Sequence, residues 1–85
     1  MDIVITSVSH GPIYLQVRQQ IESQVKDGKI SSGDSLPSPS LLAQKLLVDK
    51  GEVQRAYFEL EKSGLIVKKS AKDFLGKMKT SYSVR

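Results

Sequence analysis

The 85-residue sequence contains no cysteine and no tryptophan, and its only histidine is His10. Without cysteine the chain has no disulfide framework, no thiolate zinc site and no cysteine nucleophile, which fits a reducing compartment. A lone histidine with no paired carboxylate motif is most simply a loop residue. We therefore expect no metal centre.

Long apolar runs are also missing. The longest are "DIVITSV" and "LIV", far short of the roughly 20 residues that span a bilayer, and no basic segment followed by an apolar one marks a signal peptide. The sequence has no nucleophile elbow and no glycine loop with phosphate-cradling spacing. We expect a soluble cytoplasmic protein that spans no membrane, with no catalytic residue and no cofactor.

Charge of both signs is present but unevenly distributed. The formal net charge is +4. From Lys62 onward the chain has seven basic residues and one acid, whereas residues 1–61 have six basic and eight acidic residues. This asymmetry suggests contact with a polyanion, and a solvated, lysine-rich strand and tail would give the same pattern.

The length fits one domain with a modest core, and its first part predicts an arm and a helix. Residues 2–8 are rich in β-branched side chains, which favours a short strand or an extended arm. Pro12 is suited to the start of a helix, and Gly28 to its C-terminal cap. Between them, apolar residues recur every four positions, as expected for an amphipathic helix: Ile13, Val17, Ile21 and Val25.

A connector and a second helix follow. We expect Ile30 and Leu36 to attach an extended connector to the core. Ser38 can cap a helix by accepting a hydrogen bond from an early backbone N–H, and Pro39 suits the first helical position. The predicted apolar side of this short helix consists of leucines: Leu41, Leu42, Leu46 and Leu47.

The third predicted helix begins with a capping box, in which Asp49 accepts from the N–H of Glu52 and Glu52 reaches back to the N–H of Asp49. A rotation of about 100° per residue separates two faces. The core face comprises Val53, Ala56, Tyr57 and Leu60, and the outward face comprises Gly51, Arg55, Phe58 and Lys62, with Gln54 at its edge.

After Ser63 and Gly64, residues 65–69 and 74–78 predict two strands of a hairpin around the polar segment 70–73. The order of elements makes a mainly α fold with a small β-hairpin, a winged helix-turn-helix with three helices and a wing. We expect an N-terminal strand or arm at 1–10, the winged domain at 11–76 and a frayed, basic C-terminal tail at 77–85.

The segments "PIYLQVRQQIESQVKDGKISSGDSLPS" and "LLAQKLLVDKGEVQRAYFELEKSGLI" resemble the N-terminal DNA-binding domain of the GntR family of bacterial transcription regulators, over roughly residues 11–75. Departures occur where that family contacts DNA: an acid-arginine-acid motif is replaced by Pro39–Leu41, a Ser-Arg-Thr-Thr helix start by Asp49–Glu52, and a glycine-flanked wing tip by Ala71–Asp73. Too few residues follow the predicted wing for the family's C-terminal effector-binding domain, so the chain is either a piece of a longer regulator or a stand-alone winged helix.

The resemblance implies a transcription regulator that binds double-stranded DNA as a homodimer, with the third helix in the major groove and the wing on the phosphate backbone. Arginine and glutamine can pair with base edges, glycine permits close approach, and lysine neutralises phosphate. A solvated helix face and a lysine-protected strand edge are the structural alternatives. The candidate DNA-binding residues are Ser38, Ser40, Lys50, Gly51, Gln54, Arg55, Lys68, Lys69 and Lys72.

A second hypothesis is that the chain is a degenerate winged helix, serving as a protein–protein interaction or dimerisation module without specific DNA binding. Phe58 falls on the outward face of the third helix, flanked by basic residues. Exposed aromatic residues beside cations are favoured at protein interfaces. The candidate interface residues are Phe58 and Lys62.

Overall fold

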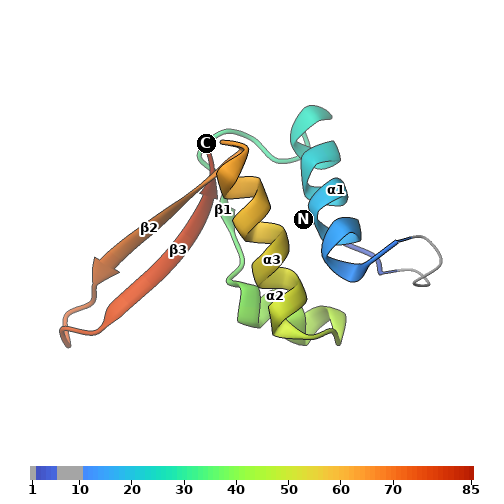
Figure 1. Cartoon of the computed structure of the whole chain (residues 1–85). Coiled ribbons are helices and arrows are strands. Elements are labelled where there is room, and N and C mark those ends of the chain that lie inside the picture. Colours follow the sequence, from blue (N-terminus) through green and yellow to red (C-terminus); the bar gives the residue numbers. More distant parts are fainter. Residues whose placement is uncertain (1, 6–10) are drawn as a thin grey trace.

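The computed structural model describes residues 2–5 and 11–85, and it has the expected winged helix-turn-helix fold (Figure 1). Three helices and three strands follow one another along these ranges: α1 (Ile13–Lys26), β1 (Ser35–Leu36), α2 (Pro39–Leu46), α3 (Lys50–Lys62), β2 (Ile66–Lys72) and β3 (Met78–Val84). The strands form one antiparallel sheet in the order β1-β3-β2. No helix in these ranges is both long enough and apolar enough to cross a membrane.

Helix α3 lies at the centre of the molecule, with α1 and the β-hairpin on opposite sides of it (Figure 1). The predicted core face is confirmed, because Val53, Ala56, Tyr57 and Leu60 are fully buried. Full burial of an aliphatic side chain stabilises the fold by roughly 1.5–3 kcal/mol. The core that holds α3 in place also contains residues of every other element, among them Val17, Ile21, Leu36, Leu42, Ile66 and Val84.

The start of α2 is formed as predicted. The Ser38 hydroxyl oxygen accepts a hydrogen bond from the N–H of Leu41 at 3.2 Å, and Pro39 occupies the first turn. The predicted apolar side is only partly correct: Leu42 is buried, but Leu41 is 48% exposed and Leu47 is 91% exposed. Leu47 is the C-cap in the left-handed conformation, with φ 57°, so the chain leaves the helix there and its side chain does not follow the helical face.

Residues 2–5 form no strand and lie against α1 as an arm. The side chain of Gln20 makes two hydrogen bonds with the backbone of Val4, accepting from its N–H at 2.9 Å and donating to its carbonyl at 2.7 Å. Gln24 donates to the carbonyl of Asp2 at 2.6 Å. These amides supply the hydrogen bonds that a neighbouring strand would otherwise give. Residues 6–10, which include His10, lie outside the described residues.

The hairpin is longer than predicted, and its second strand is displaced. Strands β2 and β3 pair from Ile66 opposite Val84 to Lys72 opposite Met78. Residues 74–78, predicted as the second strand, form the turn and only the first residue of β3, and residues 77–85, predicted as a frayed tail, contain the central strand of the sheet. Both expectations were wrong because the first four residues of β3 are exposed and three of them, Lys79, Thr80 and Ser81, are polar, so hydrophobicity gives little signal.

The wing tip is also displaced from its predicted position. Ala71 and Lys72 belong to β2. The chain reverses over residues 73–77, where Gly76 has φ 81° and donates its N–H to the carbonyl of Asp73 at 3.0 Å. The glycine that the tight turn requires is therefore present, a few residues later than expected.

Candidate nucleic-acid interface

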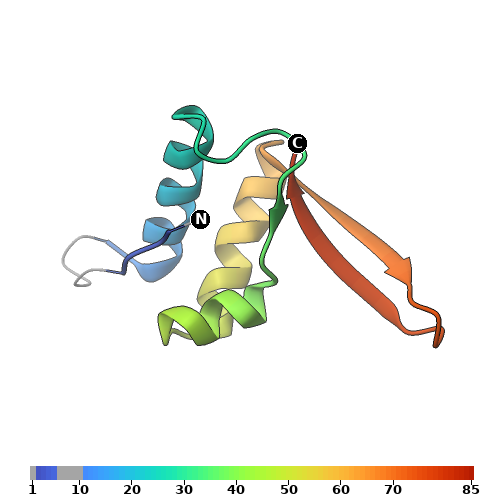
Figure 2. The same ribbon diagram turned by 180° about the vertical axis from the view of Figure 1, so that it is seen from behind.

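A groove opens between the start of α2, the first half of α3 and the hairpin. We call it the wing-side groove; it is about 310 Å³ in volume and is lined by Ser38, Pro39, Ser40, Lys50, Gln54, Lys68, Thr80 and Tyr82. Figure 2 shows the hairpin extending away from the helices on this side. The charged side chains of the lining are two lysines, and the positive end of the α2 dipole lies beside them. The groove therefore suits an extended anion.

The structure brings together five of the predicted DNA-binding residues in this groove: Ser38, Ser40, Lys50, Gln54 and Lys68. They come from three successive parts of the fold: the start of α2, the first half of α3, and β2. Thr80 and Tyr82 also line the groove and were not predicted, because their strand was not recognised. Tyr82 lies directly opposite Lys68 in the β2–β3 register. The sequence pattern that could have revealed this strand is the alternation of Thr80, Tyr82 and Val84 with serines.

The wing lysines are divided between the two faces of the hairpin. Side chains of a strand alternate between faces, and directly paired residues share a face. Lys68 and Lys72 therefore share the face of Tyr82, which lines the groove, while Lys69, paired with Ser81, lies on the opposite face. Among the predicted residues of β2, Lys68 and Lys72 are the ones directed to the side of α3.

Tyr57 fixes the elements of the wing-side groove relative to one another. Its hydroxyl group donates a hydrogen bond to the carbonyl of Pro37, directly before α2, at 2.7 Å. Its ring meets the ring of Tyr82 edge to face, with centroids 4.9 Å apart and planes at 78°. Burial, with a smaller effect of Tyr82, raises the pKa of Tyr57 far above its ordinary value. The Tyr57 side chain thus links α3 to the segment before α2 through its hydroxyl group and to β3 through its ring.

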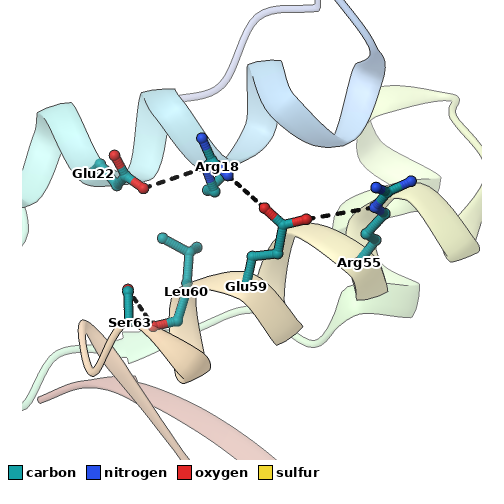
Figure 3. A network of polar contacts seen from close by, with 6 residues as sticks. All are labelled: Arg18, Glu22, Arg55, Glu59, Leu60 and Ser63. Atoms are coloured by element: carbon teal, nitrogen blue, oxygen red, sulfur yellow. Dashed lines mark hydrogen bonds and ion pairs between the residues drawn. The ribbon is translucent and has the colours of Figure 1, made fainter.

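Arg55 lies on the other side of α3, facing α1. Its guanidinium carbon is 3.9 Å from the ring centroid of Tyr14, and its Nε is 3.5 Å from a carboxylate oxygen of Glu59. Glu59 also pairs with Arg18, whose Nε lies 3.4 Å from Glu22 (Figure 3). These contacts join α1 to α3. Arg55 does not line the wing-side groove, and contact between Arg55 and DNA stays a prediction.

The two predicted interface residues lie on the same side as Arg55. They line a hollow of about 600 Å³, the α1–α3 hollow, formed by Arg18, Glu22, Arg55, Phe58, Glu59, Lys62 and Ser63. The Phe58 side chain is 61% exposed, and the Lys62 ammonium nitrogen is 5.8 Å from its ring centroid. This hollow is larger than the wing-side groove, but it mixes three cations with two carboxylates. It is a less suitable surface for phosphates.

The predicted capping box at the start of α3 is wrong in both of its bonds. Asp49 accepts from the N–H of Gly51 at 2.9 Å, not from that of Glu52. The Glu52 carboxylate accepts from the N–H of Tyr14 at 3.0 Å, in the first turn of α1, where Pro12 offers no side-chain cap. A tertiary partner replaces the local one because α1 begins beside α3. Glu52 is therefore directed to α1 and does not line the wing-side groove.

Gly51 and the remaining acid, Asp49, are exposed at the start of α3. The Gly51 N–H is bound to Asp49, so part of that carboxylate charge is satisfied within the helix cap. Residues 2–5 and 11–85 contain no cluster of three or more histidine, cysteine, aspartate or glutamate side chains that could hold a metal ion.

Comparison with known proteins gives the same family from sequence and from structure. Residues 13–73 match the family model described as bacterial regulatory proteins, gntR family. The chain is 40% identical over 58 residues to the HTH-type transcriptional repressor YtrA of Bacillus subtilis, and 36% identical over 58 residues to YhcF, an uncharacterized HTH-type transcriptional regulator of the same organism. Each alignment covers 68% of the chain, but only 45% and 48% of the two relatives, so the chain spans about half their length.

Solved structures with the same fold include YtrA from Sulfolobus acidocaldarius, described as a GntR-family transcription factor. It is 33% identical, with a TM-score of 0.79 over 99% of this chain and 81% of that one. AraR(DBD), solved in complex with operator ORX1, is 23% identical, with a TM-score of 0.71 over 100% and 96% of the two chains. At that identity the likeness to AraR(DBD) concerns the fold.

Proposed function

The chain belongs to the GntR family of bacterial regulatory proteins, and on that premise we propose that it is the DNA-binding domain of a transcription regulator. Its ligand is double-stranded DNA, and its place of action is the cytoplasm, where bacterial DNA lies. The YtrA relative of Bacillus subtilis is named a transcriptional repressor, which supports the same role here.

The observation that carries this proposal is the wing-side groove. It combines a serine-capped helix start, two lysines and a glutamine side chain on one surface, contributed by α2, α3 and β2. Phosphate contacts from lysines, serines and helix N-termini position a protein on the duplex, and amide side chains read base edges. The groove has both kinds of group and no carboxylate in its lining.

In the proposed complex, the first half of α3 enters the major groove. Gln54 faces the base edges, where its amide can pair with adenine, and Gly51 permits close approach of the helix. Lys50, Lys68 and Lys72 contact the phosphates on either side. The carboxylate of Glu52 does not oppose this, because it is bound to the N–H of Tyr14.

We also propose that the complete regulator acts as a homodimer on inverted half-sites. Winged domains of this type read one half-site each, and two-fold symmetry in the protein matches two-fold symmetry in the operator. The described chain would then bind a half-site weakly on its own. Dimerisation is expected to raise affinity for the full operator through simultaneous binding of both domains.

The test is fluorescence anisotropy of a labelled random-sequence duplex, titrated with the protein at several salt concentrations between about 50 and 200 mM. Circular dichroism is recorded on the same samples to establish that the protein is folded. We expect saturable binding. The logarithm of the association constant should fall linearly with the logarithm of the salt concentration, with a slope that corresponds to several phosphate contacts. Folded protein that does not bind at the lowest salt would contradict the proposal.

A second candidate function rests on the exposure of Phe58. An aromatic ring that is 61% exposed beside Lys62 is the kind of anchor found at interface centres. In this alternative, the α1–α3 hollow binds a protein partner or a second copy of the chain. It is compatible with DNA binding, because the two surfaces lie on different sides of α3.

A further inference from the structure

The tip of the wing has solvent-exposed apolar side chains. Phe74 is 96% exposed, Leu75 is 67% exposed and Met78 is 62% exposed. Figure 1 shows this end of the hairpin projecting well away from the helices, so no other described element covers it. Three large apolar side chains at one projecting turn are more than the isolated exposed residues of an ordinary surface.

The turn that carries them is closed by hydrogen bonds. One carboxylate oxygen of Asp73 accepts from the N–H of Leu75 at 2.9 Å and from the N–H of Lys77 at 3.0 Å. The backbone of Asp73 adds two more bonds, donating to the carbonyl of Lys77 at 2.9 Å and accepting from the N–H of Gly76 at 3.0 Å. Phe74 and Leu75 are therefore presented by an ordered turn, and binding through them costs little further ordering.

The surroundings of the tip favour a polyanion. Lys72, Lys77 and Lys79 flank it and are exposed. The one acid of the wing, Asp73, has its carboxylate engaged in the turn. Apolar side chains surrounded by lysines are complementary to duplex DNA. Its phosphates are negatively charged, and the faces of its stacked base pairs, which lie between them, are apolar.

The reach of the wing places this point beyond the major groove. From Lys68, which lines the wing-side groove, to Lys72, the last residue of β2, is four residues, or about 13 Å at the rise of a strand, and the turn that carries Phe74 lies beyond Lys72. The major groove is only about 12 Å wide. With α3 in that groove and Lys68 at its edge, the wing crosses the phosphate backbone and its tip reaches the adjacent minor groove.

We propose that Phe74, supported by Leu75, inserts as an apolar wedge into a base step of the minor groove and kinks the duplex. This inference rests on the proposed function as a DNA-binding domain. Apolar wedges of this kind partly unstack a step and bend DNA by about 20–90°. Pyrimidine–purine steps such as TA open most readily, so they are the expected sites of insertion.

The experiment measures affinity and bending on the same DNA. A duplex of about 30 bp with TA steps at its centre carries a donor and an acceptor dye at its two ends, and protein is added at several salt concentrations. Anisotropy gives the affinity and the salt slope, and energy transfer gives the bend. Phe74→Ala is compared with the native protein and with Val4→Ala, which truncates another exposed apolar residue (66% exposed) on the N-terminal arm.

The native protein and Val4→Ala are expected to bind and to raise energy transfer equally. Phe74→Ala should weaken binding on the order of tenfold, as loss of a base-stacking aromatic does, with an unchanged salt slope because no charge is removed, and should abolish the bend. Native protein that binds without bending, or a Phe74→Ala variant that binds and bends like it, would overturn the wedge and leave the proposed function intact. Absence of native binding would overturn both.

A second copy of the chain is the competing occupant of the tip. Sedimentation velocity of the native protein and Phe74→Ala, without DNA, distinguishes it. Both should sediment as the same species. A native dimer that Phe74→Ala converts to a monomer would overturn the wedge, because the tip would then be a protein contact.

Discussion

The carboxylate of Glu52 accepts a hydrogen bond from the backbone N–H of Tyr14, 3.0 Å away, and so connects the first turn of α3 to the first turn of α1. The bond gives α1 a cap that its own sequence does not supply. It also places a negative charge at the positive end of a helix. The Glu52 carboxylate, at the start of the proposed recognition helix, thus caps α1.

Removing this cap is expected to destabilise the domain. Glu52→Ala should lower the free energy of unfolding by about 1–2 kcal/mol, as loss of a helix N-cap does, and Glu52→Gln, which keeps an acceptor, should lower it less. Urea unfolding followed by circular dichroism gives the values. Glu61→Ala is the matched control, because Glu61 is exposed on the same helix. If Glu52→Ala lowers the free energy of unfolding no more than Glu61→Ala does, Glu52 does not cap α1.

Lys68 is expected to contribute one phosphate contact. Lys68→Ala should weaken binding to random duplex and reduce the magnitude of the salt slope by about 0.9. Lys26→Ala removes the same charge from the far end of α1 and should leave the slope unchanged. Anisotropy titrations across the salt range compare the two variants at equal net charge. Equal slopes in the two variants would show that net charge alone drives binding.

The raised pKa of Tyr57 predicts alkaline instability. Because burial raises the pKa in the folded state, the stability that Tyr57 contributes is fully present below its unfolded pKa, near 10. It is lost as pH rises above that value, at up to about 1.4 kcal/mol per pH unit. Tyr57→Phe should cost about 1 kcal/mol near neutral pH, for the lost hydrogen bond to Pro37.

The same variant should also lose less stability between about pH 8 and pH 11 than the native protein. Urea unfolding at both pH values measures the difference. Comparison of the two proteins removes the contribution of other groups that titrate in this range. An identical pH dependence would mean that Tyr57 is ionised as easily in the folded protein as in the unfolded chain.

Phe58 provides the test of the second candidate function. If the α1–α3 hollow binds a second copy, the native chain should self-associate in sedimentation equilibrium and Phe58→Ala should be monomeric, with unchanged affinity for DNA. The ring is largely exposed, so its truncation should not unfold the domain. Native protein that stays monomeric at high concentration would argue against a homodimer through this surface.

Periodicity was sufficient to predict the helices and the buried face of α3, because a packed helix repeats its apolar side chains every three to four residues. It failed for β3, whose first four residues are exposed, and for Leu41 and Leu47, which lie beside buried residues but are themselves exposed. The bond of Glu52 could not be predicted either. A local capping box and a tertiary cap require the same residue types, and only the packing of α1 against α3 distinguishes them.

The candidate site was predicted in part. Serines, lysines and a glutamine from three segments gather in the wing-side groove as a winged helix requires, whereas Arg55 faces α1 because Tyr14 and Glu59 provide a stacking surface and an ion pair there. Tyr82 was missed together with its strand. The projecting Phe74 was assigned to a strand, which concealed its exposure.

Nuclear magnetic resonance can show whether DNA binds in the wing-side groove. A ¹⁵N-labelled chain is titrated with a short duplex, and backbone amide shifts are mapped on the structure. If DNA binds there, the largest shifts should fall on residues 38–41, 50–54 and the wing, with little change around Phe58 and Lys62. Shifts concentrated on the α1–α3 hollow, or no shifts with saturating duplex, would contradict it.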